Sequence, residues 1–131
     1  MINMDMVGRL NDSSRTLTVG GIGTSPSWAS TFSSISDTRY FKIKFDSSGT
    51  GPSDHSSFYR KDLPVLFFFT GLHTDYHKPG DDAERINYEG QYRILQLIEN
   101  VVKKTPAQNK LVFTKTREQQ MGTSTRFSVS L

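Results

Sequence analysis

The chain has 131 residues, of which 34% are hydrophobic, and its 16 Lys and Arg against 13 Asp and Glu give a formal net charge of +3. Such a length fits one domain, and the scattered charges predict neither a nucleic-acid-binding stripe nor a basic membrane patch. The chain has no cysteine, which excludes disulfides, thiolate catalysis and zinc sites built from Cys. No apolar stretch approaches the roughly 18 residues of a membrane span, and residues 1–10 lack the pattern of a signal peptide.

The spacing of apolar residues predicts strands that alternate with helices. The first half contains a predicted strand at residues 2–10, a strand at 17–23, a helix at 27–35 and a half-exposed strand at 40–46. The second half contains a predicted helix from Ser53 or Asp54 to about residue 61, a buried strand at 65–70, a helix from Asp81 or Asp82 to 104, a short strand at 111–114 and a polar tail. This order indicates an α/β fold, a layered sheet with flanking helices.

Polar loops rich in His and Asp flank the predicted strand at 65–70. All three histidines of the chain lie between residues 51 and 82. Loops on a rigid sheet often carry function, although ordinary surface loops explain the same pattern. Imidazole and carboxylate are suitable zinc ligands. The candidate ligands or their partners are Asp5, Asp54, His55, His73, Asp75, His77, Asp81 and Asp82. Asp5 is alternatively a turn-facing carboxylate near the end of the chain.

Other chemistries lack their sequence signatures. Ser53, Asp54 and His55 are the residue types of a hydrolase triad, but adjacent side chains rarely face one another, and no G-x-S-x-G turn is present. The glycines at 20–23 do not form a G-x-G-x-x-G, and no P-loop sequence occurs. Serine-hydrolase chemistry is therefore rejected, and nucleotide binding is unsupported.

Four segments in order resemble the bacterial co-catalytic di-zinc aminopeptidases, whose family includes glutaminyl cyclases and carboxypeptidase-like relatives. They are NMDMVGRL at 3–10, GPSDHSSF at 51–58, DLPVLFFFTGLHTDYHKPGDD at 62–82 and INYEG at 86–90. The resemblance implies a partial zinc-exopeptidase (phosphorylase/hydrolase-like) fold. Residues 1–104 would form the C-terminal part of the catalytic domain, and residues 105–131 a terminal strand and a tail or linker. That tail looks like the segment that leads into a PDZ domain in some relatives.

The resemblance also implies roles for single residues. Asp5 matches a ligand of one zinc and His77 a ligand of the other. Tyr76 occupies the position whose hydroxyl, in some members, hydrogen-bonds the substrate carbonyl oxygen, and a donor there stabilises the developing oxyanion. Asp54 and Asp81 match outer partners of the site, which metal-bound His generally requires. The alternatives are an aromatic wall for Tyr76 and a helix cap for Asp54 and Asp81.

The chain departs from the family in one respect. Its relatives carry an upstream His, a bridging Asp and a consecutive Glu pair, and none of these has a counterpart here. No two of the four glutamates are adjacent: they are Glu84, Glu89, Glu99 and Glu118. One protein ligand for each zinc is too few to hold either ion tightly. We therefore expect weak or absent zinc binding and no activity of the chain alone, and the start inside a predicted strand suggests that it was cut from a longer protein.

Three functions remain open: part of a zinc aminopeptidase acting on peptides, a glutaminyl-cyclase-like acyl transferase, and a non-catalytic interaction module. The cyclases usually carry Trp before the last His ligand, so Tyr76 favours a peptidase. The resemblance implies an exported protein, periplasmic or extracellular, with no nucleic-acid or membrane partner. Missing neighbouring strands would expose a sheet edge at 2–9 or at 65–70. We therefore expect self-association or marginal stability of the isolated chain.

Overall fold

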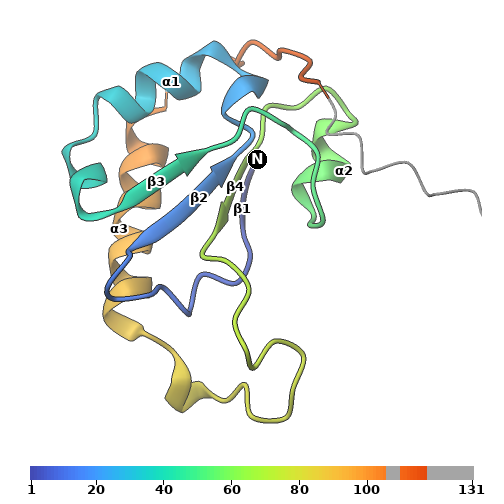
Figure 1. The fold of residues 1–131 in the computed structure, drawn as a ribbon. Coiled ribbons are helices and arrows are strands. Elements are labelled where there is room, and N and C mark those ends of the chain that lie inside the picture. Colours follow the sequence, from blue (N-terminus) through green and yellow to red (C-terminus); the bar gives the residue numbers. More distant parts are fainter. Residues whose placement is uncertain (106–109, 118–131) are drawn as a thin grey trace, which may run out of the picture.

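The fold is a mixed four-stranded sheet with flanking helices (Figure 1). The computed structural model describes residues 1–105 and 110–117. The elements in chain order are β1 (Ile2–Met4), β2 (Thr16–Gly20), η1 (Ile22–Thr24), α1 (Pro26–Ser33), η2 (Ser36–Tyr40), β3 (Lys42–Phe45), α2 (His55–Tyr59), β4 (Leu66–Phe69), η3 (Ala83–Arg85) and α3 (Tyr88–Lys104), where η marks a 3₁₀ turn. The predicted α/β class is therefore confirmed.

The strands lie in the order β1-β4-β2-β3. β1 pairs parallel with β4, β4 antiparallel with β2, and β2 parallel with β3. Met4 and Val19 both lie opposite Phe68 in this register. Because β1 and β4 run in the same direction, the segments that follow them leave the sheet at the same end (Figure 1). This end carries the candidate site.

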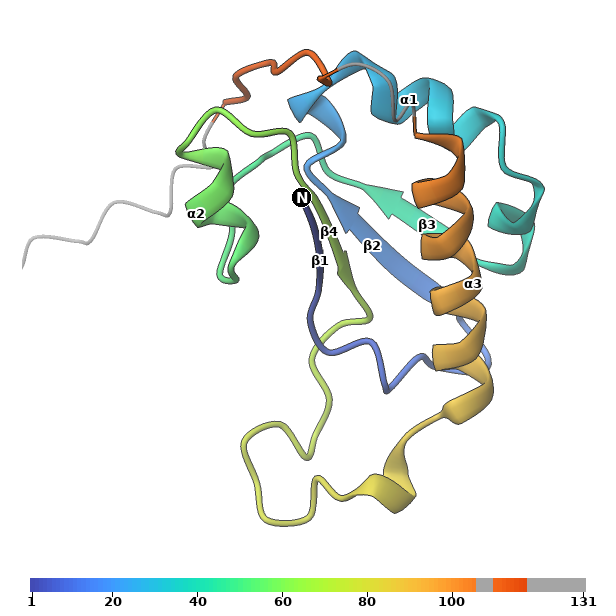
Figure 2. The ribbon, with the colours of Figure 1, turned by 180° about the vertical axis from the view of Figure 1, so that it is seen from behind.

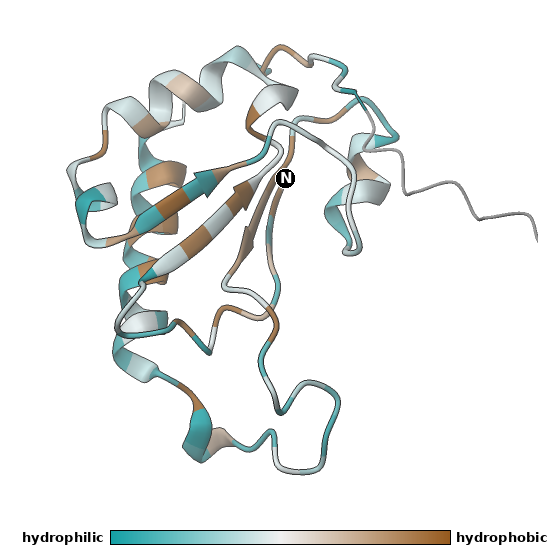
Figure 3. Cartoon of the chain, in the orientation of Figure 1, coloured by the Kyte–Doolittle hydropathy of each residue, from teal (hydrophilic) through white to brown (hydrophobic). Residues whose placement is uncertain are grey.

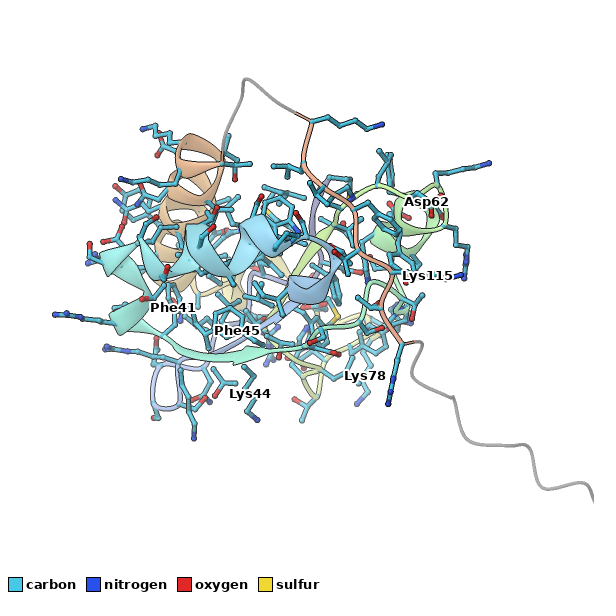
Figure 4. The ribbon with its side chains drawn as sticks, turned by 90° about the horizontal axis from the view of Figure 1, so that it is seen from above. Phe41, Lys44, Phe45, Asp62, Lys78 and Lys115 are labelled. Atoms are coloured by element: carbon cyan, nitrogen blue, oxygen red, sulfur yellow. The ribbon has the colours of Figure 1, made fainter. Side chains whose placement is uncertain are left out.

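The apolar core lies between one face of the sheet and the two longest helices, α1 and α3 (Figures 2 and 3). Leu66 and Phe68 of β4 are fully buried, whereas Phe67 and Phe69 on the opposite face are half-buried. The helical spacing predicted for α3 is confirmed for Ile94, Leu97, Ile98 and Val101, which are buried. It is wrong for Ile86, which precedes the helix, and for Val102, which is 55% exposed. At the far edge of the sheet, alternation on β3 directs Phe45 toward α1 and Lys44 away from it (Figure 4).

Both N-terminal strands are shorter than predicted, because the backbone turns left-handed directly after each. Residues 2–10 were expected to be extended, but β1 ends at Met4 and Met6 has a φ of 55°. The expected strand at 17–23 ends at Gly20, because Gly21, with a φ of 81°, turns the chain into η1. A Cβ on Gly21 would lie 2.4 Å from the Val65 carbonyl oxygen, so only glycine fits this turn.

The predicted acidic helix caps are wrong. Asp54 precedes α2 without a side-chain cap hydrogen bond, and Asp82 precedes η3 in the same way. The helix expected from Asp81 or Asp82 begins only at Tyr88, where the Asn87 side chain accepts a 2.9 Å bond from the Gly90 amide. The Asn87 amide donates to the Gly8 carbonyl at 2.8 Å. This bond attaches the residue just before α3 to the segment after β1, and the helix starts at the next residue.

Two expectations about strands are also corrected. Residues 111–114 form no strand, since their one bond to η1, from the Thr114 amide to the Thr24 carbonyl, is not part of a ladder. The strand at 65–70 is interior rather than an edge, and the edges of the described sheet are β1 and β3. The remaining predicted tail, residues 118–131, lies outside the described residues, and self-association stays a prediction. Within the described ranges, no helix is long and apolar enough to cross a membrane.

A buried threonine hydroxyl ties η1, α1 and β4 together. The Thr24 Oγ1 lies 2.7 Å from the Gly21 carbonyl oxygen and accepts from the Val65 amide at 3.0 Å and the Trp28 indole at 3.2 Å. Thr24 is fully buried, so water cannot replace these bonds. Its hydroxyl therefore links α1, through Trp28, to the residue that precedes β4, Val65.

We expect Thr24→Val to leave the Val65 amide and the Trp28 indole buried and unpaired. The free energy of unfolding should fall by about 1–3 kcal/mol for each unpaired group, measured by urea denaturation. Thr24→Ser is the control, because it keeps the hydroxyl and removes one methyl group, worth about 1 kcal/mol. Equal losses in the two variants would contradict a role for the hydroxyl.

Candidate functional site

The segments after β1 and β4 enclose a pocket of about 540 Å³, a size suited to a small ligand or a peptide end. Four of the five predicted site residues line it together: Asp5, Tyr76, His77 and Asp81. The rest of the lining consists of Met6, Gly8, Arg9, His73, Asp82, Ala83 and Ile86. The fold thus brings together residues that lie more than 70 positions apart in the chain.

The fifth predicted residue, Asp54, does not line this pocket. It lies exposed just before α2, and its charge raises the pKa of the neighbouring His55. Ser53, the residue before it, reaches the site instead. The motif at 51–58 indicated this turn. The sequence does not show which side chains of a turn face the site, so Ser53 was not predicted as a site residue.

A short hydrogen-bonded chain orients the Asp5 carboxylate. The Asn3 side-chain amide donates to the Ser53 hydroxyl at 2.8 Å, and this hydroxyl donates to Asp5 Oδ2 at 2.9 Å. The serine therefore holds the Asp5 carboxylate in one orientation. No sequence signal links Asn3 to Ser53, because 50 positions separate them and only the β1–β4 pairing brings α2 near β1.

His55 forms the buried support of this network. Its ring stacks on Phe67 at a centroid distance of 4.3 Å, and its Nδ1 lies 3.4 Å from the Asn3 amide nitrogen. Burial lowers the pKa of His55, against the opposing effects of a hydrogen bond with the Thr50 backbone and the charges of Asp5 and Asp54. Burial thus favours the neutral imidazole, and His55 is not among the residues that line the pocket.

Tyr76 and His77 lie on the loop between β4 and η3. Their rings stack at 3.8 Å with an interplanar angle of 20°, and Tyr76 is 41% exposed. His77 has a φ of 53° and Met6, across the pocket, a φ of 55°. Left-handed residues other than glycine cost about 1–3 kcal/mol each and persist only where the surroundings hold them. Two of the four such residues in the described chain lie at this pocket, and the other two, Arg15 and Asp62, lie outside it.

Arg9 joins the two sides of the pocket. It donates to Asp75 Oδ2 at 2.6 Å and to Asp81 Oδ1 at 2.9 Å, and His73 Nε2 lies 3.7 Å from Asp81 Oδ2. The Arg9 hydrogen bond, helped by the charge of Arg85, lowers the pKa of Asp75. Asp81 is therefore an ion-pair partner of Arg9, and its predicted role as an outer partner of the site stays a prediction.

The donor set of the pocket is short of a complete zinc site. Among residues 1–105 and 110–117, no group of three or more His, Asp or Glu side chains is placed to hold one ion. A catalytic zinc takes three protein ligands. Asp5 and His77 have the right donor atoms, but by themselves they do not fit a full centre.

The fold is a mixed α/β sheet with a pocket beyond the carboxyl ends of two parallel strands, and comparison with known proteins identifies the family. The model of peptidase family M28 matches residues 1–102, so the chain belongs to this family. Among solved structures, the LapA aminopeptidase of Legionella pneumophila is similar in fold, with a TM-score of 0.63, 20% identity and coverage of 79% of this chain and 30% of that one. A second LapA structure gives a TM-score of 0.61 with 22% identity and the same coverage. Comparison with curated sequences found no match.

We expect His55 to make the fold less stable in mild acid. Its pKa is lowered in the folded state, so the unfolded chain binds the proton more readily. Stability is then full above the ordinary value of about 6.5 and is lost as the pH falls from there toward the lowered folded-state pKa, by at most about 1.4 kcal/mol per pH unit. Thermal unfolding between pH 7.5 and 5 measures it.

His55→Gln is the matched variant, since it keeps polar atoms but does not titrate. The variant should be less stable at pH 7.5 and should lose stability less steeply in acid than the wild type. Parallel stability curves for the two proteins would show that His55 does not titrate across this range.

Proposed function

We propose that this chain supplies part of the catalytic domain of an M28 aminopeptidase, which removes N-terminal residues from peptides. The observation that carries the proposal is the meeting of Asp5, Tyr76 and His77 in one pocket of a chain that belongs to this family. The chain spans about 30% of the length of the solved aminopeptidases it matches. In this proposal the activity therefore requires further metal ligands that this chain does not supply.

In this proposal Asp5, His77 and Tyr76 have separate roles. Asp5, oriented by Ser53, and His77, on its loop, would each be a ligand of one zinc in the larger enzyme. When bound, the zinc pair would supply a Lewis acid and an activated water. Tyr76 donates its hydroxyl to the substrate carbonyl oxygen, where negative charge develops. A tyrosine in this position favours the peptidase over the acyl transferase.

The pocket also supports inactivity of the isolated chain. No glutamate is among the residues that line it, so the general base and the remaining ligands would come from elsewhere. We therefore expect no release of product from aminoacyl p-nitroanilides by the chain in the presence of zinc. Release that persists in Asp5→Ala and His77→Ala would contradict the proposed site.

Zinc titration by calorimetry tests the proposed ligands. We expect weak binding by the wild type, because three donors to one ion are lacking, and weaker binding still by Asp5→Ala and His77→Ala. Glu99→Ala is the control, since Glu99 is exposed and pairs only with Lys103 on α3 in the described structure. Tight binding that neither Asp5→Ala nor His77→Ala reduces would place the donors elsewhere and overturn the assignment.

A further inference from the structure

The loop that carries Tyr76 and His77 has little apolar anchorage. Residues 70–82 have no helix or strand, and they project beyond the end of the sheet (Figure 1). None of them belongs to the buried core of the described chain, and Leu72 is 71% exposed. The position of this loop therefore depends on polar contacts.

Arg9 supplies these contacts from the β1 side of the pocket. Its fork of donors reaches Asp75 and Asp81 at once, at 2.6 and 2.9 Å. Its side chain is 19% exposed and that of Asp75 17%, so the pair is largely shielded from water. Charge-assisted bonds of this length are among the strongest polar contacts in proteins.

The other hydrogen bonds of the loop hold it less directly. Thr70 bonds the Met6 carbonyl at the very start of the loop, and backbone bonds such as that from the Tyr76 amide to the His73 carbonyl stay within it. Arg85 reaches Asp75 at 3.4 Å but lies on η3, the element that directly follows the loop. Within the described residues, Arg9 is thus the side chain that ties the middle of the loop to the segment of Asp5.

We propose that Arg9 is a positioning residue, which fixes the loop at 70–82 against the segment after β1 and so sets Tyr76 and His77 in place relative to Asp5. Asp75 and Asp81 engage both terminal nitrogens of the guanidinium and offset its charge within the protein, so these two contacts hold the loop. The left-handed backbone of His77 needs such a restraint, since it relaxes once the surroundings release it. The inference rests on the proposed function only for the roles of the three pocket residues.

The stacked pair gives a direct reporter. The Tyr76 ring lies 3.8 Å from the His77 ring, so its ring current shifts the His77 proton signals in NMR spectra. The chain has only three histidines, which makes their ring signals assignable, and His55, buried beneath the pocket, serves as an internal reference. The signals of Tyr76→Leu define the unstacked position.

We expect Arg9→Met to move the His77 signals at least halfway to their positions in Tyr76→Leu. The amides of residues 72–82 should exchange at least tenfold faster, while the His55 signals and the amides of α3 stay unchanged. Arg9→Lys keeps the charge but cannot span two carboxylates, so it should fall between Arg9→Met and the wild type. Arg85→Met is the matched control and should leave the His77 signals in place, because Arg85 is 57% exposed and makes one long contact.

Wild-type His77 signals in Arg9→Met, or an equal shift in Arg85→Met, would overturn the proposal. If Arg9→Met does not fold, the double variant Asp75→Ala with Asp81→Ala removes both acceptors of Arg9 from the loop side, and unchanged His77 signals in it would also overturn the proposal. The experiment needs neither zinc nor substrate. Its failure would therefore leave the peptidase assignment standing, and a failed zinc titration would leave this result standing.

Discussion

β1 and β4 run parallel and end at the site, and their pairing continues past the ends of both strands. The Asp5 amide donates to the Phe68 carbonyl at 3.1 Å, and the Thr70 hydroxyl bonds the Met6 carbonyl. The segment with Asp5 and the loop with His77 must therefore leave the sheet side by side. Pockets at the carboxyl ends of parallel strands form in this way, and every proposed role in this protein depends on it.

Alternation along β4 couples the stability of the fold to the site. Leu66 and Phe68 point into the core beneath α1 and α3 and are fully buried. Phe67 points to the other face, where His55 stacks on it and reaches Asn3, which in turn bonds the serine that orients Asp5. One strand thus packs the core with one face and supports with the other the hydrogen bonds that orient Asp5.

The two walls of the pocket are held by different forces. The wall with Asp5 is anchored by sheet pairing and by the buried His55, whereas the wall with Tyr76 and His77 is anchored by ion pairs of Arg9. The first wall therefore depends on backbone pairing and a buried ring, and the second on a few polar contacts between side chains. The donor set in the described residues is incomplete for zinc, which agrees with a chain that spans about 30% of its solved relatives.

The sequence by itself determined the class of fold, the buried strand of β4, the apolar face of α3 and the family. Each of these depends on local periodicity or on ordered motifs, which a linear chain displays. Sequence reasoning also named Asp5, Tyr76, His77 and Asp81, which the fold then placed in one pocket. It did not find Ser53, Asn3 or Arg9, and it placed helix caps at Asp54 and Asp82 that do not form. Only the tertiary structure decided the roles of Ser53, Asn3 and Arg9, because each faces a partner 48 to 72 positions away. It also decided where α3 starts, because the Asn87 amide is bonded to the distant Gly8 carbonyl.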